Sequence, residues 1–173
     1  MLTMKKFESI LNLVKEEYPS LYSELIFIEE SDEFKMNSVC GTHMIYVQNK
    51  LEDCPHTKWM YEYLRNEYQL DSNKFMYYNF IEIFAFIHEI GHLYYIEAQE
   101  TKDAAEYYRE YKEKAYNTYA EAWEAYRQLP NEKLADEFAV NIIKRNFLDI
   151  WAISNEITKE KAQEEYNFWN MEL

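Results

Sequence analysis

Glycine, cysteine and basic residues are all scarce in this chain of 173 residues. It contains 2 Gly and 2 Cys, and 18 Lys and Arg stand against 32 Asp and Glu, for a formal net charge of −14. Cys40 and Cys54 are too few and too far apart for a CxxC metal or redox motif, so free thiols are favoured over a disulfide. An acidic surface repels phosphate backbones and anionic lipids. Direct binding to nucleic acid or to a membrane surface is therefore not expected.

Long apolar segments are also missing. Glu8, Asn12 and Lys15 interrupt the N-terminal stretch in which a signal peptide would have its apolar core. The longest nearly apolar run, Tyr77 to Ile87, includes two polar residues and is too short to span a bilayer. We therefore expect a soluble, cytoplasmic protein.

The residues that are present favour one folded domain. Hydrophobic residues make up 48% of the chain and aromatic residues 18%, including 17 Tyr. That composition is unlike a disordered chain, and the length suits a single domain over residues 1–173.

Hydrophobic periodicity predicts an α+β fold. Residues 1–50 are expected to form an N-terminal helix, ending at Pro19, and a small antiparallel β-sheet in which two of three short strands make a hairpin. A mainly helical body should follow. Its parts are a helix around 59–68, a helix within 71–99, a helical insertion over 100–128, a helix over 131–147 capped by Asn131, and a last helix capped by Thr158.

The sequence His88-Glu89-Ile90-Gly91-His92, within the 71–99 helix, is an HExxH motif. Residues four apart share a helix face, so His88 and His92 can bind one Zn²⁺ ion per chain. Glu89 can then act as the general base for a zinc-activated water that attacks a peptide carbonyl. The motif is short and also occurs by chance, but its apolar helical surroundings favour zinc over two incidental histidines.

Gly91 is unusual because it lies inside this helix, where glycine costs about 1 kcal/mol relative to alanine. We interpret it as the point where another backbone, from the sheet or from the 131–147 helix, approaches closely.

A catalytic zinc site usually needs a third protein ligand. A metzincin would have a histidine where this chain has Ala98. Glu132 and Asp136, four apart on a later helix, could instead supply the third ligand and a partner for the second ring nitrogen of a histidine. Acidic residues that stabilise the start of an ordinary amphipathic helix explain the pattern equally well.

HEIGH followed by Glu132-x-x-Ala135-Asp136-x-Phe138-Ala139 resembles the ImmA/IrrE metallopeptidase family, over residues 81–143. The two-His-one-Glu pattern is also similar to thermolysin-like zinc peptidases. The resemblance implies zinc ligands His88, His92 and Glu132, with Glu89 as the base. It also implies that the substrate is a repressor or other regulator protein.

Other features depart from that family or stay open. The segment 93–131 is long for the family, and we interpret it as solvated helix packing in preference to a substrate-docking element or lid. His43 and His56 are possible substrate or oxyanion contacts, although surface or packing roles are favoured. If the strand 42–48 is an edge strand, a peptide substrate could pair with it.

The sequence is compatible with two classes of function. The leading prediction is a zinc endopeptidase that cleaves a specific protein, and a transcriptional regulator with a basic domain would be attracted by the −14 charge. The alternative is a non-catalytic, acidic zinc-binding protein that sequesters a basic partner, either as a nucleic-acid mimic or as a regulator-binding module.

Overall fold

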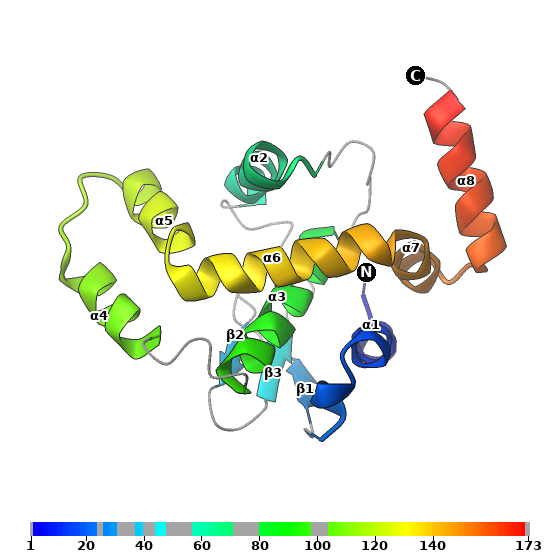
Figure 1. The fold of residues 1–173 in the computed structure, drawn as a ribbon. Helices are drawn as coiled ribbons and strands as arrows, with labels where there is room; N and C mark the ends of the chain where they lie inside the picture. The colour runs from blue at the N-terminus through cyan, green and yellow to red at the C-terminus, as the bar shows by residue number, and fades with distance from the viewer. Residues whose placement is uncertain are drawn as a thin grey trace.

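The structure is a computed structural model that describes residues 2–23, 26–30, 37–39, 44–47, 57–70, 80–97 and 104–171. Within these ranges the chain is mainly helical, with three short strands (Figure 1). The elements are α1 (Met4–Glu17), the 3₁₀ helix η1 (Pro19–Ser23), β1 (Phe27–Glu30), β2 (Asn37–Val39), β3 (Met44–Val47), α2 (Thr57–Tyr68), α3 (Phe80–Glu97), α4 (Ala104–Glu113), α5 (Tyr119–Arg127), α6 (Pro130–Arg145), α7 (Phe147–Asn155) and α8 (Lys159–Met171).

The three strands form a mixed sheet in the order β1-β3-β2. Strands β2 and β3 pair antiparallel, as a hairpin would, but β1 pairs with β3 in parallel. The expectation of an antiparallel sheet was therefore wrong for one of the two pairings. The three strands alternate in direction along the chain, so β1 and β3 run the same way. These two strands become neighbours in the sheet, and their pairing is therefore parallel.

Helix α3 is the centre of the hydrophobic core. It contacts β2 and β3 on one side and α6 on another, and α1 and α2 also touch it. Its apolar residues therefore do not form a single stripe but are buried almost all round the helix, as expected for an internal helix. The ring of Phe86 packs edge-on against Phe7 of α1, with ring centroids 4.9 Å apart. The buried apolar residues of α3 are Phe80, Ile81, Ile83, Phe84, Phe86, Ile87, Ile90 and Leu93.

The predicted insertion is a pair of helices, α4 and α5, that both contact α6 (Figure 1). Helix α6 begins at Pro130, one residue earlier than expected, and Asn131 does not cap it. Proline fits the first helical position because the amide hydrogen that it lacks would have no partner there. Asn131 is instead buried in the first turn, where its side chain forms other contacts.

Helices α7 and α8 pack on each other and complete the C-terminal part. The Oγ1 atom of Thr158 accepts a hydrogen bond from the backbone N–H of Lys161 at 3.2 Å, so the predicted cap of α8 is confirmed. Among the helices in the described ranges, none combines the length and the apolar character needed to cross a membrane.

Candidate metal site between α3 and α6

The backbones of α3 and α6 meet at Gly91. A Cβ atom placed on Gly91 would lie 3.1 Å from the Cα atom of Ala135 and 3.2 Å from its carbonyl oxygen. The Cβ atom of Phe138 would also be 3.2 Å away. Such contacts are tighter than ordinary van der Waals packing. The close approach expected at Gly91 is therefore confirmed, and its partner is the 131–147 helix.

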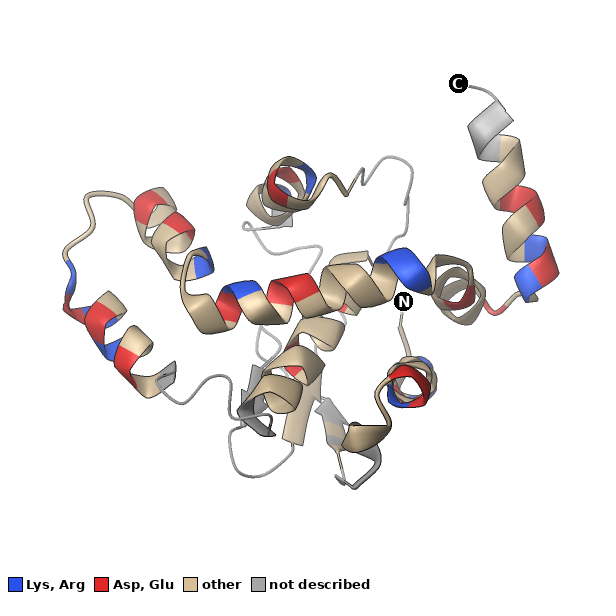
Figure 2. Ribbon diagram, viewed as in Figure 1, with Lys and Arg blue, Asp and Glu red and all other residues tan. Residues whose placement is uncertain are grey.

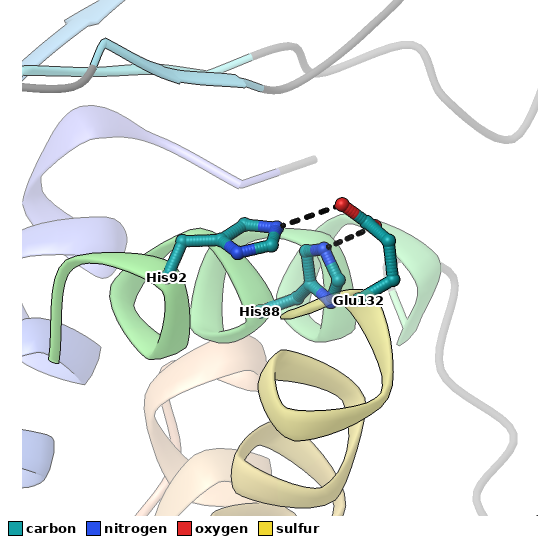
Figure 3. Close-up of side chains that lie close together, drawn as sticks. All are labelled: His88, His92 and Glu132. Atoms are coloured by element: carbon teal, nitrogen blue, oxygen red, sulfur yellow. Dashed lines mark ion pairs between the residues drawn. The ribbon is translucent and has the colours of Figure 1, made fainter. Parts of the chain in front are cut away.

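This approach brings His88 and His92 of α3 to Glu132 in the first turn of α6 (Figure 3). The Nε2 atom of His88 lies 3.3 Å from Glu132 Oε2, and the Nε2 atom of His92 lies 3.3 Å from Glu132 Oε1. The carboxylate is fully buried, and the two histidines are 6% and 13% exposed at their side chains. One ligand atom from each of the three residues can be chosen so that all lie within 4.8 Å of one another.

These distances suit a single metal ion. Zinc binds imidazole nitrogen and carboxylate oxygen at about 2.0–2.2 Å in a tetrahedron, which places two ligand atoms roughly 3.3–3.5 Å apart. The Nε2 atom of each histidine lies at about that distance from one of the two Glu132 oxygens, His88 from Oε2 and His92 from Oε1. The set of two imidazoles and one carboxylate also leaves a fourth position open, which is typical of catalytic zinc sites. The residues present therefore fit Zn²⁺.

The Glu132 carboxylate is further surrounded by hydrogen-bond donors. The hydroxyl of Tyr108, from α4, donates to Oε1 through a short hydrogen bond, and the Asn131 amide donates to the same oxygen at 3.2 Å. The Asn131 amide also donates to the Tyr108 hydroxyl at 2.8 Å. Burial alone would raise the pKa of Glu132, but the two histidines outweigh it and hold that pKa far below its ordinary value. Glu132 is therefore a carboxylate, the form that binds metal.

Tyr108 keeps its proton at neutral pH. Its partial burial, and then the negative charge of Glu132, raise the pKa of the phenol well above its ordinary value. Its hydroxyl is thus a donor beside the three candidate metal ligands His88, His92 and Glu132, which we call the metal-ligand cluster.

Asp136 lies one turn further along α6, behind His88. Its Oδ1 atom is 2.9 Å from His88 Nδ1, at hydrogen-bond distance but without the N–H···O angle of a good hydrogen bond. The Tyr63 hydroxyl donates to Asp136 Oδ2 at 2.9 Å, and Arg127 at the end of α5 forms a very short ion pair with Oδ1. Arg127 Nη1 is also 3.3 Å from Glu132 Oε2. One buried arginine thus joins both carboxylates.

Of the other residues proposed for the site from the sequence, some lie in the described ranges and some do not. Glu89 lies on α3 directly after His88 and is 9% exposed. His43 and His56 lie outside the described residues. Pairing of a peptide substrate with the strand 42–48 required that strand to be at an edge, and this condition is not met, because β3 lies between β1 and β2 and pairs with both. A peptide therefore cannot add to β3.

Sequence reasoning did not assign four residues to this site: Tyr63, Tyr108, Arg127 and Asn131. Tyr63 and Tyr108 are two among 17 tyrosines. Asn131 was expected only as a helix cap, and Arg127 is the last residue of α5, so the one hint for these two was that both lie close to Pro130. The insertion therefore does more than cover the core, because Tyr108 and Arg127 both reach the metal-ligand cluster.

Comparison of the chain with known family models, curated proteins and solved structures gives no match. The resemblance to zinc metallopeptidases accordingly rests on the HEIGH and Glu132–Ala139 motifs and on the His88, His92 and Glu132 geometry.

Proposed function

We propose that this protein is a zinc-dependent endopeptidase. The observation that supports the proposal is the buried triad of His88, His92 and Glu132, whose ligand atoms lie within 4.8 Å of one another and could hold one metal ion. The HExxH motif adds Glu89 at the position where such enzymes have their general base.

Each residue has a distinct task in this proposal. His88, His92 and Glu132 would hold Zn²⁺, which when bound polarises the substrate carbonyl and lowers the pKa of water. Glu89 takes a proton from the attacking water and delivers it to the nitrogen of the leaving amine. Asp136 orients the ring of His88, and Arg127 balances the charge of Asp136 and Glu132.

The proposed substrate is a protein, with a transcriptional regulator as the leading class. The support is electrostatic: the net charge of −14 favours encounter with a basic partner, such as a regulator that carries a DNA-binding surface. Acidic residues are spread over most of the helices (Figure 2).

The test combines metal analysis with hydrolysis. Wild-type protein and Glu89→Gln should each bind about one zinc per chain, but Glu89→Gln should not cleave substrate because it lacks the base. Glu132→Gln should lose zinc as well as activity, whereas Glu137→Gln, an exposed carboxylate on the same helix, is the matched control. Substrate is sought by co-expression with neighbouring genes, looking for a protein that disappears only with active enzyme. Full activity in Glu89→Gln would refute the mechanism.

The second candidate is a zinc-binding protein that sequesters a basic partner without cleaving it. The acidic surface is the observation that favours it. This alternative predicts that Glu89→Gln keeps the full biological effect, whereas the peptidase proposal predicts that the effect is lost.

A further inference from the structure

A cavity of about 430 Å³ lies between α2 and α5, next to the metal-ligand cluster but separate from it. The two helices are neighbours on the same side of α6 (Figure 1). Tyr63 and Arg127 line this cavity and also bind Asp136. One wall of the cavity is therefore built from the residues that stand behind His88.

Aromatic rings form much of the lining. The rings of Trp59 and Trp123, both half-buried, are in tilted contact, with centroids 6.1 Å apart at an interplanar angle of 58°. Trp123 also meets Tyr63 edge-on at 5.7 Å. The faces of tryptophan attract cations within about 6 Å of the ring. Tyr63 is already used in this way, because the Arg127 guanidinium lies 5.5 Å from its ring centroid.

The polar part of the lining is negative. Glu62, Glu67 and Glu124 lie at the exposed rim of the cavity. Among the described residues, Glu62 has a distant partner, Lys58 at 4.0 Å, and no ion pair is found for Glu67 or Glu124. The cation of the lining, Arg127, is already matched by Glu132 and Asp136. A ligand with a positive charge therefore complements the cavity.

We propose that this cavity binds a lysine or arginine side chain of a partner protein, against the rings of Trp59 and Trp123 and beside Glu67 and Glu124. The volume is within the range of small-ligand sites. The inference goes beyond the proposed function and does not depend on hydrolysis, because none of these groups is a metal ligand or the base.

The probes are three blocked tripeptide amides, Gly-Lys-Gly, Gly-Arg-Gly and Gly-norleucine-Gly, added to the full-length Glu89→Gln variant with zinc. Tryptophan fluorescence and calorimetry should show saturable binding of the Lys and Arg peptides and roughly tenfold weaker binding of the norleucine peptide. Added salt should weaken the basic peptides most, because the rim carboxylates are exposed.

Two double variants identify the site. Glu67→Gln with Glu124→Gln should weaken the Lys peptide severalfold, and both positions are exposed, so the fold should be kept. The matched control, Glu113→Gln with Glu164→Gln, removes two exposed carboxylates elsewhere and should change little. The inference is overturned if the norleucine peptide binds equally, if the first variant binds as wild type, if no basic peptide binds at millimolar concentration, or if free spermidine alone binds.

The outcome is separable from the peptidase proposal. Hydrolysis by wild-type protein without peptide binding in the cavity would overturn only this inference. Saturable binding of the basic peptides, in a wild-type protein that takes up no zinc and cleaves nothing, would overturn only the peptidase.

Discussion

The two helices α3 and α6 meet in two regions of opposite character. Around Gly91 the contact is apolar and made by backbone and small atoms, with Ala135 at 3.1 Å from the position of a Cβ. One turn away, the same helices face each other through buried charges, with His88 beside Glu132 and Asp136. The first region sets how closely the helices approach, and in the second that approach brings together three side chains that could hold a metal ion.

The difference shows which region is built for stability. Close apolar packing stabilises the fold without any further partner. Burial of a carboxylate instead lowers the stability of the fold unless a cation lies beside it. In this chain Arg127 supplies part of the positive charge that the two carboxylates need. A metal ion held by His88, His92 and Glu132 would supply further positive charge. The charged region is therefore the one that a change in metal occupancy should affect.

The largest effect is expected from removing the buried cation. Arg127→Met removes the ion pairs that Glu132 and Asp136 form with the arginine, so the free energy of unfolding without zinc should fall by about 3–5 kcal/mol. Zinc should raise the melting temperature of this variant more than that of wild type, because the metal replaces part of the lost charge. Arg109→Met is the control: Arg109 is exposed and pairs with exposed Glu106. Equal losses in both variants would contradict this role of Arg127.

The apolar region can be broken at Gly91. Gly91→Leu should lower the free energy of unfolding by about 3 kcal/mol, because its side chain would overlap Ala135 and Phe138. Gly91→Ala should cost less, since its gain in helix propensity offsets part of the overlap. Urea denaturation without zinc measures the free energy of unfolding of both variants and of wild type. If Gly91→Leu is as stable as wild type, the two backbones are not held as closely as described.

A milder change in the charged region is Asp136→Asn. The amide cannot orient His88 as a carboxylate does, so zinc affinity should fall roughly 10–100-fold. Competition with a chromophoric chelator measures the affinity, and Glu137→Gln, the next residue and exposed, is the control. An unchanged affinity would mean that Asp136 serves only to neutralise Arg127.

The sequence predicted the parts of this site that depend on local spacing. His88, His92, Glu132 and Asp136 lie four apart in two pairs, and helical geometry alone places each pair on one face. The close approach at Gly91 was predictable because glycine is costly in a helix without a reason. The N-terminal helix α1 and the α8 cap at Thr158 followed from equally local signals.

What was missed depends on contacts between distant parts of the chain. Nothing in the local pattern distinguishes Tyr108 from Tyr107, since only the position of α4 beside α6 brings one of them to Glu132. The parallel pairing of β1 with β3 depends in the same way on which strand becomes the neighbour, which residue alternation does not encode.

Tyr108→Phe should give the smallest effect, and it tests how the insertion acts on the charged region. The substitution removes one hydroxyl that donates to Glu132 and accepts from Asn131, while the ring stays. If the hydroxyl holds the carboxylate in its metal-binding orientation, zinc affinity should fall about threefold to tenfold. Tyr107→Phe, on the same helix, should leave zinc affinity unchanged. A rise in zinc affinity in Tyr108→Phe would contradict the supporting role, because the hydroxyl would then compete with the metal for Glu132 Oε1.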